Sequence, residues 1–313
     1  MNAPIIVFAY KRPRHLARVL EALARNPGAD QSVLFVYCDG AKRPEDASAV
    51  AETRRIARAA SGFERVEIIA RESNFGLSRS IIEGVGEVCE RFGRAIVLED
   101  DVVPTPYFLN YVNEALDVYA DDERVLSIGC HTFDAGMELP ETFFLDIPDC
   151  WGWGVWQRSW TSFNEDGATL LAEIVRRNAQ DAFDFGGAYP YTRMLEEQVM
   201  GLNQSWAIRW YAHAFLSGGL VLYPRRAVTR NIGFDGSGTH GGGPGGYGSV
   251  QCADGAIHVV RAVIEESPTA RLAWRLALQA MASPSWQGIG GSIKQNMRRV
   301  YRGLKPYLSK AWS

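Results

Sequence analysis

The chain has 313 residues, of which 47% are hydrophobic and 11% aromatic. This length suits one large domain or two closely packed ones of ~100–200 residues each, and the composition excludes a disordered chain. The net charge of −3 gives no sign of nucleic-acid binding, and the five cysteines contain no CxxC pair that would indicate a zinc ribbon.

The first half alternates between short apolar runs and amphipathic segments. The apolar runs, which predict buried strands, lie at 4–10, 33–38, 65–70, 95–98 and 125–129. The segments with helical spacing lie at 14–26, 44–61, 77–91 and 106–120. Alternation of this kind with short connections is typical of βαβ units. We therefore expect an α/β fold whose sheet is mostly parallel and flanked by helices.

The second half is less regular. Strands are predicted at 143–147 and 220–223, and helices at 168–178 and 188–216. Residues 151–160 are dense in tryptophan, and residues 228–248 are rich in glycine. The glycines lack the pattern of a P-loop or dinucleotide motif, so we interpret this segment as a mobile flap.

The C-terminal region differs in charge from the rest of the chain. Residues 1–266 carry 25 bases and 36 acids, whereas residues 267–313 carry eight bases and no acid. Within 290–310, bases alternate with apolar residues at helical spacing, which favours a basic amphipathic helix on an anionic membrane surface. The alternative is an ordinary helix docked on the acidic body. Without a signal peptide or a run of ~20 apolar residues, we expect the protein in the cytoplasm or at the inner face of the cell membrane.

Charged residues follow three of the predicted strands directly. They are Arg12, Asp39 and the acidic run 99–101. In parallel sheets, ligands bind beyond the carboxyl ends of the strands, so this edge is the expected site. Arg12 could face a phosphate or a base, or lie in a solvated loop. Asp39 could accept a base N–H, or simply form a turn before Gly40.

The run Glu99-Asp100-Asp101 is the most informative motif. Three adjacent carboxylates repel one another, so a positive group or water should lie beside them. Carboxylate oxygens are the ligands that Mg²⁺ and Mn²⁺ prefer, with waters and substrate phosphates completing the shell. Helix capping is the alternative. We favour a metal that bridges the protein to a diphosphate.

Two further features carry candidate binding residues. Trp151 and Trp153 are spaced by glycines and could form an aromatic wall for a sugar ring, although core packing is the commoner fate of tryptophan. His240 lies in the glycine-rich segment and could meet a metal or a diphosphate. The alternative for His240 is an exposed histidine without a partner.

The order of these segments over residues 4–241 resembles the GT-A-fold glycosyltransferases, and most closely the N-acetylglucosaminyltransferase I type. The matching segments are IIVFAYKRPRHLARVLEAL, VLFVYCDG, IVLEDDVVPTPYFLNYVNEAL, DDERVLSIGCHTFD, FFLDIPDCWGWGVWQRSW, SWAIRWYAHAFLSGGLVLYP and SGTHG. The EDD run with its flanking strand and helix is the specific part. The resemblance implies a Rossmann-like GT-A fold with a mixed, mostly parallel sheet.

The resemblance also implies a nucleotide-sugar donor, a UDP-sugar in the first instance, and Mn²⁺ or Mg²⁺. Arg12 would contact the nucleotide and Asp39 the uracil. Glu99 would lie near the donor sugar, and Asp100 near the ribose and the metal. Asp101 would be the direct metal ligand.

The remaining roles are less well matched. The segment Trp151–Trp153 would line the donor–acceptor pocket, and the glycine-rich segment would close over the diphosphate with His240. Inverting members place an acid just before a late tryptophan as the base, but this chain has Asn203-Gln204-Ser205-Trp206. Either Glu197 or Asp235 acts instead, or the mechanism is retaining, or the protein binds without catalysing.

The sequence thus predicts a GT-A domain at 1–266 and a basic helical tail at 267–313. The domain would comprise a nucleotide-binding half (1–130) and an acceptor-side half (131–266). The expected activity is metal-assisted transfer of a hexosyl or N-acetylhexosaminyl group to a hydroxyl of a glycan or lipid-linked saccharide, as in polysaccharide biosynthesis. The rivals are a non-catalytic binder of nucleotide sugars or glycans and a nucleotidyltransferase.

Overall fold

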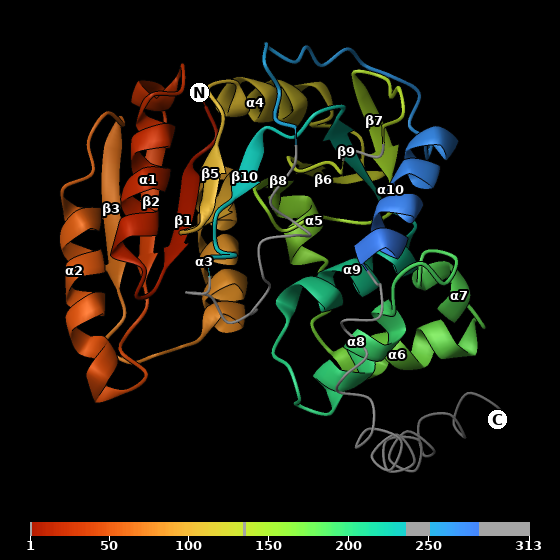
Figure 1. Ribbon diagram of the computed structural model, residues 1–313, viewed down its shortest axis with the longest axis horizontal. Helices are drawn as coiled ribbons and strands as arrows, with labels where there is room; N and C mark the ends of the chain where they lie inside the picture. Colours follow the sequence, from red (N-terminus) through yellow and green to blue (C-terminus); the bar gives the residue numbers. More distant parts are fainter. Residues whose placement is uncertain (1, 134–135, 236–250, 282–313) are drawn as a thin grey trace.

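A computed structural model describes residues 2–133, 136–235 and 251–281. The main sheet has eight strands in the order β3-β2-β1-β4-β8-β6-β9-β7 (Figure 1). Its strands are β1 (Ile5–Ala9), β2 (Val33–Cys38), β3 (Arg65–Ala70), β4 (Arg94–Glu99), β6 (Val125–Gly129), β7 (Thr142–Leu145), β8 (Trp153–Trp156) and β9 (Leu220–Pro224). Strands β7 and β8 run antiparallel to their neighbours, and the other pairs are parallel. The expected mixed, mostly parallel sheet is confirmed.

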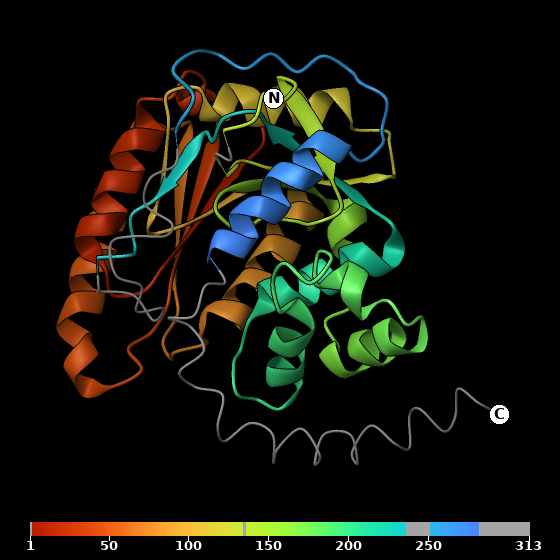
Figure 2. The ribbon, with the colours of Figure 1, turned by 45° about the vertical axis from the view of Figure 1, so that its right-hand side comes forward.

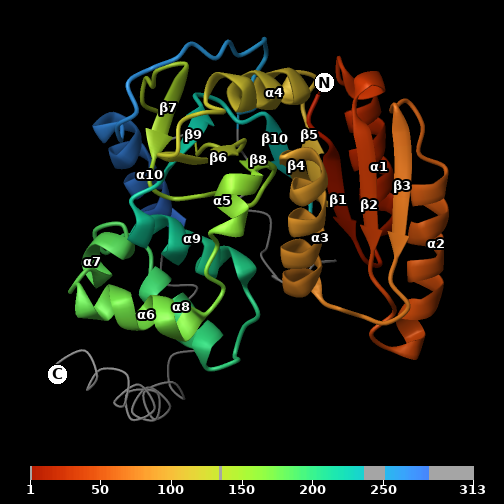
Figure 3. The ribbon, with the colours of Figure 1, turned by 180° about the vertical axis from the view of Figure 1, so that it is seen from behind.

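Helices cover both faces of the sheet. The described helices of eight or more residues are α1 (Pro13–Ala24), α2 (Ala47–Arg58), α3 (Leu77–Phe92), α4 (Phe108–Val118), α6 (Gly167–Arg176), α8 (Tyr191–Val199), α9 (Trp206–Ser217) and α10 (Pro268–Met281). Two shorter helices are α5 (Gln157–Thr161) and α7 (Gln180–Phe183). Along β1, Ile5 and Val7 pack with α1 and α4, whereas Ile6 and Phe8 pack with α3 on the other face (Figure 3). Successive residues point to opposite faces, so these strands are apolar throughout.

Two details differ from the sequence prediction. Two short strands, β5 (Val102–Pro104) and β10 (Thr229–Asn231), pair as a separate antiparallel ribbon. Three residues are too few for a periodicity to show. The helix predicted over 188–216 was wrong as a single element, because it breaks into α8 and α9. Gly201 has a φ of +73°, and the Ser205 hydroxyl accepts the Ile208 N–H (3.2 Å) to begin α9.

The C-terminal region begins as part of the body. Helix α10 packs against the second half of the chain, with Trp274 and Leu278 buried in its core (Figure 2). Arg271 pairs with Asp146 (3.0 Å) and with Glu266. Helix α10 therefore packs on the second half of the chain, and the boundary between domain and tail at residue 266 stays a prediction. The amphipathic segment 290–310 lies outside the described residues. Among the described helices, none has both the length and the apolarity to cross a bilayer.

Candidate donor and metal site

The parallel strands β1, β2, β4 and β6 end at the same edge of the sheet, because β8 runs antiparallel to both β4 and β6. The residues that follow these strands are Arg12, Asp39, the run 99–101 and His131. The charged residues that follow the strands in the sequence therefore lie together at one edge of the sheet.

Arg12 is the positive group beside the acidic run. Its Nη1 lies 2.8 Å from Asp101 Oδ2, and its Nη2 contacts Asp100 Oδ1. The Tyr10 N–H donates to the other oxygen of Asp100 (3.2 Å). Burial raises the pKa of Asp100, and Arg12 opposes that rise. One guanidinium thus holds two carboxylates that are only 2% and 8% exposed as residues.

Asp101 keeps one oxygen free for a ligand. Its Oδ1 is buried and has no hydrogen-bond partner among the described residues. Above it, the chain after β10 passes so closely that a Cβ on Gly233 would lie 2.1 Å from Asp101 Oδ2. Ile232 N–H also donates to the Asp101 carbonyl (2.8 Å). A buried carboxylate oxygen without a donor is costly unless a cation or water meets it.

The site fits a metal that is shared with a substrate. No group of three His, Cys, Asp or Glu in the described part of the chain is arranged to hold a metal ion. Mg²⁺ and Mn²⁺ sites of the shared kind need only one or two protein carboxylates, because water and phosphate oxygens supply the rest. Asp101 would hold the ion, with Asp100 beside it.

Glu99, at the end of β4, is destabilised in its charged form by burial and by its acidic neighbours. Burial, followed by the charges of Asp101 and Asp100, raises the pKa of Glu99 to about 8, and Arg12 acts in the opposite direction. A cation or a hydroxyl-rich ligand at this edge would favour the charged form. The repulsion inferred from three adjacent acids therefore contributes, after burial, to the raised pKa of Glu99.

Asp39 serves the protein itself in this structure. Its two oxygens accept hydrogen bonds from the backbone N–H groups of Gly40 (2.9 Å), Phe75 (2.8 Å) and Gly76 (2.9 Å). They also accept one from the Asn74 side chain (2.9 Å). Asp39 thus ties β2 to the loop before α3, and a uracil N–H would have to share an acceptor that is already occupied.

We expect Asp39→Asn to lower the free energy of unfolding by about 2 kcal/mol, because the amide replaces one charged acceptor with a donor facing other donors. Chemical denaturation of the variant measures this loss. Glu72→Gln, an exposed change in the same loop, is the control and should cost less than about 0.5 kcal/mol. A loss for Asp39→Asn as small as the control would show that the four hydrogen bonds do not hold the loop.

The two tryptophans of the predicted aromatic wall lie in different places. Trp153 is 2% exposed and stacks on Trp206 with ring centres 5.3 Å apart, so the structure places it in the core rather than at a ligand surface. Trp151 lies at the edge of the sheet. Its ring packs edge-on against the rings of His131 and Phe234, with ring centres 4.5 Å and 5.6 Å apart. Only Trp151 is brought to the candidate site.

The two candidate bases lie in different surroundings. Asp235 follows the loop that covers Asp101, and it lies 3.1 Å from His15 Nε2. Glu197 lies on α8, where it pairs with Arg193 (3.0 Å). His240 lies outside the described residues. Of Asp235 and Glu197, Asp235 is the one that lies near chain segments in contact with the acidic run, through Ile232 and Gly233.

Asp149 was not predicted from the sequence. Backbone N–H groups of Trp151, Cys150 and His131 donate to it, while burial raises its pKa to about 7. Its Oδ2 has no partner in the described part of the chain, and its charge contributes to the raised pKa of Glu99. The only sequence signal was an acid next to the tryptophan-rich segment. Without the antiparallel strand β8, that signal does not point to the site.

The raised pKa of Asp149 predicts a pH dependence of stability. The folded state holds this proton more tightly than the unfolded state, so the stabilisation present below ~4 is lost as the pH rises through about 7. Asn mimics the protonated acid. In metal-free buffer, we therefore expect Asp149→Asn to gain about 2 kcal/mol, or roughly 3 °C in Tm, relative to wild type between pH 5 and pH 8.

Thermal melts of both proteins across that pH range test the expectation. Asp121→Asn, at an exposed position, serves as the control and should run parallel to wild type. If the Asp149→Asn curve also runs parallel, Asp149 is already ionised at low pH in the folded protein.

The chain matches a known protein family and several solved structures. A family model described as "Glycosyltransferase like family 2" matches residues 3–301. No curated protein matches the chain. Matches among solved structures include S. aureus TarS, at 15% identity and a TM-score of 0.31, covering 45% of this chain and 23% of that chain. The present chain thus spans about a quarter of the length of TarS.

Two other matches are enzymes solved with their ligands. The mannosyltransferase PcManGT from Pyrobaculum calidifontis, in complex with GDP-Man and Mn²⁺, is 13% identical, with a TM-score of 0.36, covering 68% of this chain and 74% of that chain. The glucosyl-3-phosphoglycerate synthase from Mycobacterium tuberculosis, in complex with Mn²⁺, UDP and glucosyl-3-phosphoglycerate, is 13% identical, with a TM-score of 0.36. The match covers 58% of this chain and 68% of that chain.

Proposed function

Since the chain belongs to the glycosyltransferase like family 2 and has the GT-A architecture, we propose that it transfers a sugar from a nucleotide-diphosphate donor, a UDP-sugar, to a hydroxyl of a glycan or lipid-linked saccharide. The observation that carries this proposal is the acidic run at the sheet edge, where Asp101 has a buried oxygen that no described residue contacts by a hydrogen bond. A divalent metal would meet that oxygen and neutralise charge on the departing diphosphate.

The protein's own residues would act around that ion. Asp101 would hold the metal and Asp100 would lie near it and the ribose, while Glu99 would orient the donor sugar. Arg12 would contact the nucleotide once it is released from the carboxylates. Trp151 would present its ring to the sugar.

The position of Asp235 favours it as the acceptor base over Glu197, because its loop lies on Asp101 through Gly233. We leave the stereochemical outcome open, since a retaining mechanism needs no such base. The finer likeness to the N-acetylglucosaminyltransferase I type, with a hexosyl or N-acetylhexosaminyl donor, is part of the proposal. So is the binding of residues 290–310 to anionic lipid, which their composition supports.

A donor screen tests the proposal. Thermal melts with a panel of nucleotide sugars, with and without Mn²⁺ or Mg²⁺, should reveal one donor that stabilises the protein only with metal. A ligand at ~100 times its dissociation constant adds ~2.7 kcal/mol to the free energy of unfolding.

Release of UDP from the selected donor then separates the alternatives. Slow metal-dependent release supports a transferase, whereas saturable binding without release or transfer supports a non-catalytic binder. Incorporation of a nucleotidyl group from a nucleoside triphosphate and a sugar phosphate would instead support a nucleotidyltransferase. If no nucleotide sugar shifts the melt, the proposed donor site is wrong.

A further inference from the structure

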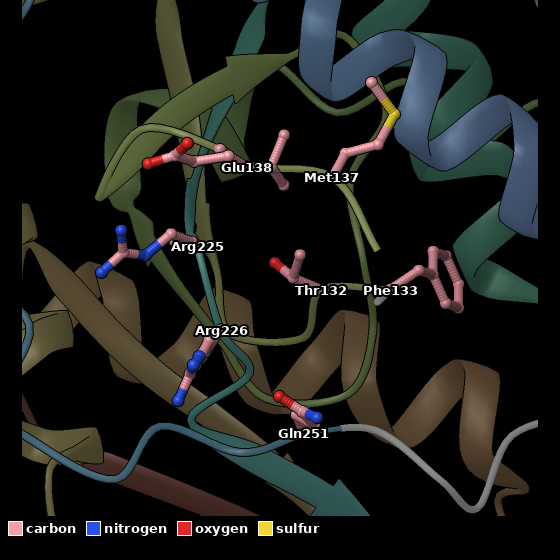
Figure 4. A pocket seen from close by; sticks show the side chains of 8 residues that line it. Thr132, Phe133, Met137, Glu138, Arg225, Arg226 and Gln251 are labelled. Carbon is pink, nitrogen blue, oxygen red and sulfur yellow. The ribbon is translucent and has the colours of Figure 1, made fainter. Parts of the chain in front are cut away.

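A second cavity lies at the same edge of the sheet, beyond the acidic run. Its volume is about 280 Å³, and its walls come from the segment after β6, the segment after β9 and Gln251. Figure 4 shows Phe133 on one side of this pocket and the guanidinium groups of Arg225 and Arg226 on the other. None of these residues belongs to the donor site described above.

The strand order places this pocket at a definite distance from Asp101. Strands β4, β6 and β9 run in the same direction. Strand β8 lies between β4 and β6, and β9 lies beside β6. At ~4.8 Å per strand, the ends of β6 and β9 lie about 10–14 Å from the end of β4. A group in the pocket is therefore too far away to be the diphosphate on Asp101, but near enough to belong to the second substrate.

Aromatic rings connect the two places. Phe133 in the pocket contacts the His131 ring (5.3 Å), and His131 contacts Trp151 (4.5 Å). Trp151 in turn contacts Phe234 (5.6 Å), which follows the glycine that covers Asp101. His131 is buried (1% exposed), so a saccharide that runs between the acidic run and the pocket would lie on the partly exposed rings of Phe133, Trp151 and Phe234, with His131 beneath them.

Among the residues that line the pocket, positive charges outnumber negative ones by one, and Arg225 is the guanidinium that no carboxylate of the described residues offsets. Arg225 is exposed, and its guanidinium has no hydrogen-bond or ion-pair partner within the described residues. Arg226 pairs with Asp254 (3.0 Å), but both side chains are exposed, and such pairs exchange partners at little cost. Glu138 on the rim supplies one negative charge against the two guanidiniums. A guanidinium without a partner can bind a carboxylate or a phosphate through two parallel hydrogen bonds.

We propose that this pocket binds an anionic group, a carboxylate or a phosphate, on the saccharide acceptor, and that Arg225 is its main contact. This inference rests on the proposed transferase function, and it narrows the acceptor to an acidic saccharide. Phe133 supports the ring that carries the charge, while the reacting hydroxyl points toward the donor.

A ligand-observed NMR titration of the full chain, saturated with UDP and Mn²⁺, tests the proposal. The probes are glucuronate, glucose 6-phosphate and glucose. We expect at least one of the two anions to bind at least about tenfold more tightly than glucose, and the stronger of them identifies the anion as carboxylate or phosphate. A tenfold difference corresponds to ~1.4 kcal/mol.

Variants locate the effect. Arg225→Met should weaken binding of the anion about tenfold, to the level of glucose, and Arg225→Lys should have an intermediate effect because it keeps the charge without the bidentate geometry. Arg18→Met, at an exposed position on α1, is the matched control and should bind as wild type does. Equal affinity for all three probes, or full affinity in Arg225→Met, would overturn the assignment of the pocket.

The donor site is measured separately. The thermal shift caused by UDP and Mn²⁺ reports that site without any saccharide. If that shift is absent, the proposed function fails, and titration of the saccharides without UDP still tests the pocket. If the shift is present and the anions bind no better than glucose, only the acceptor inference fails.

Discussion

Replacing Asp101 with asparagine should abolish the metal-dependent part of donor binding and slow sugar transfer at least about 100-fold, which corresponds to ~2.7 kcal/mol of transition-state stabilisation. Asp101 has the buried oxygen without a partner among the described residues, and it lies beneath the loop at Gly233. An amide presents one neutral oxygen to the ion, so the ion would be lost first, and neutralisation of the departing diphosphate with it.

The substitution also removes one of the two carboxylates that pair with Arg12. Loss of activity must therefore be separated from loss of folding. Asp101→Glu keeps the charge but moves it by one methylene, and we expect it to fold and to bind metal more weakly. Thermal melts with UDP, with and without Mn²⁺, give a binding readout independent of turnover. Asp30→Asn, at an exposed position, is the control. If UDP with metal stabilises Asp101→Asn as much as it stabilises wild type, Asp101 is not the metal ligand.

The location of this site was predictable because it depends on local features. A buried strand that stops at three acids places them at the sheet edge whatever the order of the strands, and the repulsion among them requires a positive neighbour. The identity of that neighbour was not predictable. Arg12 reaches Asp100 and Asp101 because β1 lies beside β4, and strand order is a property of the whole fold.

The second half shows the same limit more clearly. Strand β8 inserts antiparallel between β4 and β6, and this insertion brings Asp149 and His131 to the acidic run. It also separates Trp151, which stays at the edge, from Trp153, which enters the core. Both tryptophans border Gly152 and lie two residues apart, a spacing that strand periodicity assigns to one face, so periodicity could not have distinguished them. Residues Arg225 and Arg226 likewise meet Phe133 only through the pairing of β6 with β9.

Arg12→Met should lower the free energy of unfolding by about 3–5 kcal/mol at neutral pH in metal-free buffer, because it leaves two buried carboxylates without their cation. The methionine keeps most of the aliphatic stem, so the change is mainly one of charge. Burial already raises the pKa of Asp100 and Arg12 opposes that rise, so the variant should hold a proton more tightly than wild type. The loss should therefore be smaller at pH 5 than at pH 8. Arg14→Met, an exposed change two residues along the chain, is the control and should be nearly neutral.

The same variant separates two roles of Arg12. In the resting site, the guanidinium occupies Asp101 Oδ2 (2.8 Å), so it competes with a metal for this carboxylate. In the working site, we propose that it contacts the nucleotide. Removing it should strengthen the binding of Mn²⁺ alone and weaken the binding of UDP in the presence of Mn²⁺, each by about tenfold if one charge-assisted contact is involved. Calorimetric titrations with Mn²⁺, and with UDP at saturating Mn²⁺, measure the two constants. If both fall together, Arg12 holds the site together without competing for the metal, whereas unchanged UDP binding would exclude its contact with the nucleotide.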